Sequence, residues 1–165
     1  MADGDLLTVR VPPLGQDDEP VIVRMFEYTA FCGRRTFDSP PGNDHEDDDD
    51  YKWSLIRAKP SRYLPWLSET EFSQTDAKHD KTGRRIAGSP RLGFVPYQWK
   101  LSRLDSLRVA QREALPITLL IEPVPGGFVF EFGRHRAYWL AINNAEFVPL
   151  MVPIQQAERF RERFE

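Results

Sequence analysis

The stretch PITLLIEPVPGGFVFEFGRHRAYWLAINNAEFVPLMV, residues 116–152, carries the clearest pattern in the chain. Apolar residues alternate with others over 117–121, 128–132 and 136–142, which is the period of a β-strand. Glycine or asparagine lies between these segments, and both residues tolerate the left-handed backbone of tight turns. Pro149 indicates an edge position for the last strand, because proline cannot donate to a sheet ladder. The pattern predicts a C-terminal antiparallel β-meander.

Three earlier segments also have the pattern of strands, namely residues 6–11, 21–31 and 51–59. The first two are rich in β-branched residues and are separated by a turn-rich loop, so we expect them to pair as a hairpin. The segment that follows the third contains Pro60 and Pro65. Proline inside a helix removes a hydrogen bond, so only a short helical turn is expected there.

Two segments have the spacing of amphipathic helices. Residues 100–116 predict the first, with Ser102 as its cap, Asp105 three residues later and Pro116 as its stop. Its apolar stripe is Leu104, Leu107, Ala110 and Ala114. The second spans residues 154–164, with its apolar stripe at Ile154, Ala157, Phe160 and Phe164.

These elements together predict an α+β fold. We expect a single antiparallel sheet of about five to seven strands, including the C-terminal meander, with the two helices packed on one face. A chain of 165 residues has the size of a single domain. Within residues 1–165 we expect exposed loops at about 33–50, which is acidic, and at about 73–92, which is basic.

The totals of the sequence narrow the class of protein. The net charge is -3 and the pI is about 5.7, which argues against a dedicated nucleic-acid binder with a basic footprint. The single cysteine, Cys32, excludes an intrachain disulfide and fits a reducing compartment. No apolar run reaches the ~18 residues of a membrane span, and the N-terminus lacks the apolar region of a signal peptide. We therefore expect a soluble cytoplasmic protein with no membrane contact.

The segment NDHEDDDDYKW, residues 43–53, concentrates negative charge beside aromatic residues. Adjacent carboxylates repel one another, so the segment is expected to be an exposed loop, and a solvated loop without any partner is the simplest interpretation. The alternative is a docking site for a basic protein partner, since charge complementarity speeds association and aromatic side chains anchor interfaces. The spacing does not match an EF-hand calcium loop. The predicted partner-binding residues are Asp44, Glu46, Asp47, Asp48, Asp49, Asp50, Tyr51 and Trp53.

Two clusters of basic residues support a different function. Arg84 and Arg85 lie in the long polar stretch, and Arg134, His135 and Arg136 lie at an expected strand start. Such side chains can contact phosphate, so a small nucleic-acid-binding protein or nuclease is the alternative prediction. The competing interpretation is a turn whose charged side chains face water.

The sequence contains no recognised catalytic motif. The three histidines are far apart, no metal-ligand spacing is present, and no nucleophile elbow occurs. Cys32 is interpreted as a structural thiol. We therefore predict no catalytic residues, no metal and no cofactor, although the question of an enzymatic activity stays open.

The leading hypothesis is a non-catalytic binding protein that neutralises or occludes a basic protein, in the concrete form of an immunity or inhibitor protein. Nucleic-acid binding is the second hypothesis, and a structural subunit of a larger assembly is the third. The oligomeric state is left open.

Overall fold

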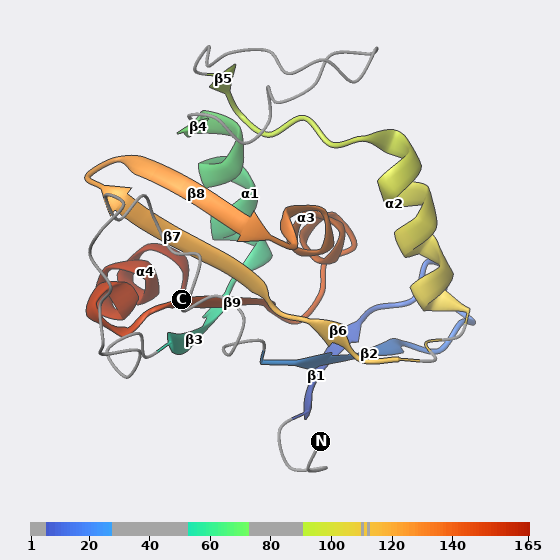
Figure 1. The fold of residues 1–165 in the computed structure, drawn as a ribbon. Helices are drawn as coiled ribbons and strands as arrows, with labels where there is room; N and C mark the ends of the chain where they lie inside the picture. Colours follow the sequence, from blue (N-terminus) through green and yellow to red (C-terminus); the bar gives the residue numbers. More distant parts are fainter. Residues whose placement is uncertain (1–5, 28–52, 73–90, 110, 112) are drawn as a thin grey trace.

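The computed structural model describes residues 6–27, 53–72, 91–109, 111 and 113–165, which form a mixed α+β fold (Figure 1). In chain order the strands are β1 (Leu6–Val11), β2 (Val21–Phe26), β3 (Trp53–Ala58), β4 (Glu71–Phe72), β5 (Arg91–Leu92), β6 (Leu115–Pro116), β7 (Thr118–Val124), β8 (Gly127–Phe132) and β9 (Val148–Pro153). The α-helices are α1 (Pro60–Glu69), α2 (Gln98–Leu104), α3 (Arg134–Ile142) and α4 (Ala157–Phe164), with the 3-10 turns η2 (Asp105–Arg108) and η3 (Ile154–Gln156).

The described strands form two main sheets and one short pair. The three-stranded sheet has the order β1-β2-β6, the four-stranded sheet has the order β3-β9-β7-β8, and β4 pairs with β5. Neighbours are antiparallel except β2 with β6 and β7 with β9, which are parallel. β6 runs into β7 through Ile117, so one extended segment takes part in both main sheets (Figure 1). Ile117 is fully buried and its N–H donates to the carbonyl oxygen of Phe26 at 2.9 Å.

The helices pack around the four-stranded sheet. α3 contacts β7, β9 and α1, and α4 lies beside β3 (Figure 1). α2 stands further out and reaches the rest of the molecule through α3 and η2. No helix formed by the described residues is both long and apolar enough to cross a bilayer.

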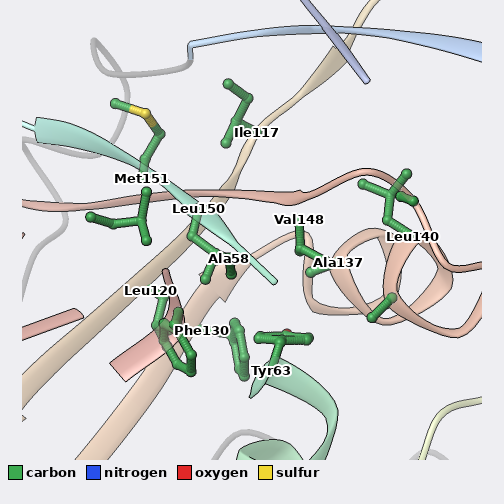
Figure 2. Packing of buried hydrophobic residues seen from close by; sticks show 14 of the residues in the cluster. Ala58, Tyr63, Ile117, Leu120, Phe130, Ala137, Leu140, Val148, Leu150 and Met151 are labelled. Atoms are coloured by element: carbon green, nitrogen blue, oxygen red, sulfur yellow. The ribbon is translucent and has the colours of Figure 1, made fainter. Parts of the chain in front are cut away.

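Aromatic side chains from distant parts of the sequence meet in the core. The ring of Trp66 in α1 packs edge-on against Phe128 of β8 at 5.1 Å and against Phe164 of α4 at 4.9 Å. Such edge-to-face pairs stabilise by about 1 kcal/mol beyond the area they bury. Figure 2 shows the adjoining part of the core, which includes Tyr63 and Phe130.

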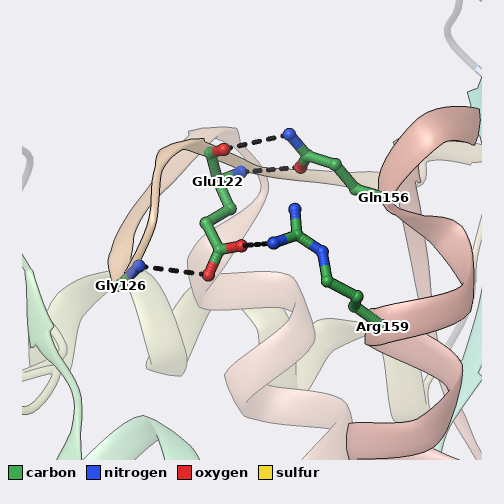
Figure 3. Close-up of polar contacts among 4 residues, drawn as sticks. All are labelled: Glu122, Gly126, Gln156 and Arg159. Atoms are coloured by element: carbon green, nitrogen blue, oxygen red, sulfur yellow. Dashed lines mark hydrogen bonds and ion pairs between the residues drawn. The ribbon is translucent and has the colours of Figure 1, made fainter.

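A polar link ties the β7–β8 hairpin to the C-terminal segment (Figure 3). Gln156 pairs with the backbone of Glu122 twice, accepting from its N–H at 2.9 Å and donating to its carbonyl oxygen at 2.9 Å. The Glu122 carboxylate pairs with Arg159 at 2.9 Å and accepts the N–H of Gly126 at 3.3 Å. The strand, its turn and α4 are therefore held together at one residue.

The α+β class predicted from the sequence is confirmed, but a single antiparallel sheet with two helices on one face is wrong, because the described residues form two main sheets and four α-helices. The strands divide between two small sheets, and two of the pairings are parallel. The hairpin of β1 and β2, the hairpin of β7 and β8, and the C-terminal helix all agree with the prediction. These elements depend on local sequence patterns, whereas the division into sheets depends on contacts between distant segments.

The strand expected at 136–142 is the helix α3. Gly133 has a left-handed φ of 80° at the N-cap, and Asn144 has a φ of 54° just after the helix. Ala137, Trp139, Leu140 and Ala141 are all buried. Buried side chains therefore occur on more than one side of this helix. Its apolar residues do not follow a single helical stripe, and their alternation in the sequence resembles that of a strand.

Three proline-related or capping predictions also need correction. α1 runs for ten residues with Pro65 inside it, so it is longer than a single turn. β9 is an inner strand, yet its parallel pairing with β7 covers only Leu150 and Met151, so the missing N–H of Pro149 falls outside that ladder. The helix expected up to Pro116 begins at Gln98 and ends at Leu104, and Ser102 is inside it.

Candidate functional site

The acidic stretch predicted to bind a partner is outside the described residues, except for its last member. Asp44, Glu46, Asp47, Asp48, Asp49, Asp50 and Tyr51 all belong to residues 28–52. Trp53 opens β3, pairs with Pro153 across the strands and packs partly buried against the core. Its indole Nε1 is buried and finds no hydrogen-bond acceptor among the described residues. Trp53 is therefore part of the body of the protein.

The basic residues predicted to contact phosphate lie only partly within the described residues. Arg84 and Arg85 are outside the described residues, and Arg134, His135 and Arg136 form the first turn of α3. His135 is only 7% exposed and Arg136 is partly buried. The guanidinium of Arg134 lies 5.7 Å from the centre of the Phe94 ring. Of these three side chains, Arg134 acts through its charge on Lys100, which belongs to the surface described next.

A group of exposed aromatic and basic side chains gathers on α2 and the residues before it. Trp99 is 56% exposed, and Val95 and Tyr97 are also exposed. Lys100 and Arg103 lie beside them on α2. We call Val95, Tyr97, Trp99, Lys100 and Arg103 the aromatic–basic surface.

α3 holds the aromatic–basic surface in place. The backbone N–H of Tyr97, at the N-cap of α2, donates to Nε2 of His135 at 3.0 Å, and the two rings stack at 5.7 Å. Leu101 is buried below the helix. After α2, the indole of Trp139 donates to Asp105 Oδ1 at 2.9 Å. The helix is therefore anchored at both ends with Trp99 on its exposed side.

The cations of this surface rest on the aromatic rings. Lys100 Nζ lies 5.4 Å from the ring centres of both Tyr97 and Trp99, and the Arg103 guanidinium lies 5.9 Å from Trp99. Neither cation forms an ion pair with any residue that the structure describes. Burial, followed by the charge of Arg134, lowers the pKa of Lys100. The positive charges of Lys100 and Arg134 therefore raise the local potential together.

His135 has a positioning role at this surface. Burial, with smaller effects from Lys100 and Arg134, lowers the pKa of its imidazole to about 4. The imidazole is therefore neutral at pH 7, and its Nε2 lone pair is engaged by the N–H of Tyr97. A side chain in this state neither binds phosphate as a cation nor accepts a substrate proton through that nitrogen.

A cleft of about 370 Å³ lies elsewhere, lined by Pro13, Leu14, Asp18, Glu19, Val21 and Arg108. The Arg108 guanidinium donates to the carbonyl oxygen of Pro12 at 3.0 Å and to Asn143 Oδ1 at 2.7 Å. Its two terminal nitrogens thus link the residue after β1 to the residue after α3. No three His, Cys, Asp or Glu side chains among the described residues are grouped as metal ligands would be. The aromatic–basic surface is the stronger candidate for function, and its chemistry is that of binding.

The sequence prediction missed this surface, although the sequence carried a signal. Val95, Tyr97 and Trp99 are three large apolar residues at alternate positions just ahead of a predicted helix, and Arg103 follows Trp99 at the i+4 spacing of a helical pair. The surface was overlooked because the predicted helix began too late to include Trp99.

Comparisons with known proteins give no relative to set beside this site. No protein-family description, no curated protein and no solved structure matches the chain.

Proposed function

We propose that this chain is a binding protein without catalysis and that the aromatic–basic surface is a contact surface for another protein. The observation that carries this proposal is the exposure of Trp99 beside two cations that no described residue neutralises. Trp, Tyr and Arg are the residues most enriched where interfaces gain their energy.

The indole of Trp99 adds little to the packing of the fold. Leu101 fills the core side of α2, and Trp99 is more than half exposed on the other side. Isolated exposed apolar residues are common, but Val95, Tyr97 and Trp99 follow one another closely along the chain. Contact with a partner would bury the apolar area that they leave in water.

Site-specific crosslinking tests the proposal. A photoreactive phenylalanine at position 99, in the full chain inside the cells that make it, should yield a discrete crosslinked protein. The same group at Ile154, which is exposed near α4, serves as the control. The crosslinked protein is then purified, and Trp99→Ala should weaken its binding about tenfold or more. Equal crosslinking at both positions, or none at position 99, would show that this surface is not a contact site.

The acidic stretch remains our proposal for a basic partner, in the form of an immunity or inhibitor protein. Its support is the run of carboxylates from Glu46 to Asp50 followed by Tyr51 and Trp53. Exchange of its acids for Asn and Gln should slow association and flatten its dependence on salt. An unchanged affinity together with an unchanged salt dependence would remove this part of the proposal.

A nucleic-acid ligand is the second candidate function. The observation in its favour is the combination of Lys100, Arg103 and Arg134 with exposed aromatic rings, which is the composition of single-strand binding surfaces. A gel shift at low salt with single-stranded RNA and DNA is the direct test. Absence of any shift would eliminate this function.

A further inference from the structure

We infer that the aromatic–basic surface binds an acidic segment of a partner protein, in which carboxylates flank an apolar side chain. This inference rests on the proposed function as a binding protein and adds the chemistry of the partner. It concerns other residues than the acidic stretch, and it assigns the opposite charge to the partner segment that binds them.

The first argument is the local balance of charge. Residues 91–109 contain four basic residues and one acid, Asp105. That acid is engaged by the indole N–H of Trp139 at 2.9 Å. The segment therefore carries a net charge of +3, and neither Lys100 nor Arg103 forms an ion pair with a described residue. A partner with negative charge complements this surface.

The second argument is the position of the cations relative to the rings. Lys100 lies over both Tyr97 and Trp99, and Arg103 lies over Trp99. Cation–π contacts of this kind hold a charged side chain near one conformation. The side chain therefore loses less conformational entropy when a partner binds. A carboxylate can pair with such a cation from the solvent side while the cation stays on its ring.

The third argument separates a protein from a nucleic acid. A nucleobase stacks on the face of an aromatic ring, and on Trp99 it would compete with Lys100 and Arg103 for that face. A nucleic acid also gains most of its affinity from many phosphate contacts, whereas this chain has a net charge of -3. A short acidic segment requires only a few cations and uses the exposed side chains of Val95 and Trp99 for its apolar residue.

Selection from a random peptide library tests the inference without knowledge of the natural partner. The full-length protein is the bait, and peptides that also bind the Trp99→Ala variant are removed. The expected result is enrichment of peptides rich in Asp and Glu around one large apolar residue. Enrichment of neutral or basic peptides, or no enrichment, would overturn the inference.

The selected peptide is then measured against matched variants. Lys100→Gln with Arg103→Gln should weaken its binding about tenfold or more and reduce its salt dependence. The control, Arg10→Gln with Arg163→Gln, removes the same charge elsewhere, including a cation that lies 5.1 Å from the Phe128 ring. Binding should change less than about twofold in this control. An equal loss in both double variants would show that net charge alone is responsible and would overturn the inference.

A single-stranded oligonucleotide is the competing ligand in the same assay. Tighter binding of the oligonucleotide than of the selected peptide, lost in the Lys100→Gln, Arg103→Gln variant, would assign the surface to nucleic acid instead. Crosslinking at position 99 to a protein whose contacting segment is not acidic would refute this inference while leaving the proposed binding function intact.

Discussion

Tyr97 and His135 are 38 residues apart in the sequence, yet the backbone N–H of one donates to Nε2 of the other at 3.0 Å. Their rings stack at 5.7 Å with an interplanar angle of 14°. The same imidazole lies edge-on to Phe94 at 5.1 Å. One buried side chain of α3 therefore fixes the start of α2 and, through it, the position of the aromatic–basic surface.

This relationship predicts a pH-dependent stability. The pKa of His135 is lowered from 6.5 to about 4 in the folded protein, so between these values the unfolded chain binds a proton that the folded chain does not. The contribution of His135 to the free energy of unfolding is therefore complete above pH 6.5 and is lost as the pH falls toward 4. Urea unfolding of the wild type and of His135→Gln across this range measures it, because glutamine can accept the N–H of Tyr97 but does not titrate.

As the pH falls, the wild type should lose unfolding free energy relative to His135→Gln. Subtracting one unfolding free energy from the other at each pH cancels the effect of the carboxylates, because these titrate in the same range in both proteins. A constant difference from pH 7 down to about pH 4 would contradict the neutral, hydrogen-bonded state of His135.

A second prediction concerns Gly133, whose left-handed φ of 80° opens α3. An added Cβ would lie 2.7 Å from Arg136 Nη2 and 2.9 Å from Thr118 Oγ1. Gly133→Ala should lower the unfolding free energy by about 2–4 kcal/mol, from backbone strain and crowding together. Gly126→Ala is the matched control, since its φ is 76° but nothing lies within 4 Å of the added Cβ. It should cost only the strain, about 1 kcal/mol, and equal losses in the two variants would show that crowding at Gly133 is absent.

A third prediction concerns the hydroxyl of Tyr63, which is fully buried without a hydrogen-bond partner among the described residues. Burial raises the pKa of this group. Removal of an unsatisfied buried hydroxyl relieves its desolvation cost, so Tyr63→Phe should leave the unfolding free energy unchanged or raise it by about 1 kcal/mol. Thermal and urea unfolding measure the change. A loss of more than about 1 kcal/mol would reveal a partner for the hydroxyl.

The fourth prediction compares two contacts of Glu122 (Figure 3). Gln156 satisfies both the N–H and the carbonyl oxygen of this strand residue, whereas Arg159, which is 59% exposed, pairs only with its carboxylate. Gln156→Ala leaves two backbone groups without their partner and should cost about 1–2 kcal/mol. Arg159→Ala removes a largely solvated ion pair and should cost about 0.5 kcal/mol. The reverse order in urea unfolding would show that the ion pair holds α4 in place.

The sequence was sufficient for the parts of the fold that local patterns determine. Alternation and turn residues predicted the hairpin of β7 and β8, and helical spacing predicted α4 around Phe160 and Phe164. The parallel contact of β7 with β9 was not predictable in this way, because it pairs Leu119 with Met151 across an intervening helix. That helix, α3, was itself predicted as a strand. The predicted meander therefore contained no helical connection that could bring β9 beside β7 in a parallel direction.

The candidate site was predictable only in part. Arg134 was singled out as a basic residue, but the burial of His135 and the proximity of Lys100 depend on how α2 docks on α3. The exposure of Trp99 likewise follows from the burial of Leu101 on the other side of the helix. Sequence alone gave the residue types, and the docking of the two helices decides which of them face water.

The last prediction separates binding from folding at the aromatic–basic surface. Trp99 is more than half exposed, and neither Lys100 nor Arg103 forms an ion pair with a described residue. Trp99→Ala and Lys100→Gln with Arg103→Gln should therefore each change the unfolding free energy by no more than about 1 kcal/mol, which is the scale of exposed cation–π contacts. Leu101→Ala on the buried side of α2 is the contrasting variant and should cost about 2–3 kcal/mol. Urea unfolding of all three proteins distinguishes the two sides of the helix. If Trp99→Ala lowers the unfolding free energy as much as Leu101→Ala does, the indole contributes to the packing of the fold, and its exposure is no longer an argument for a binding partner.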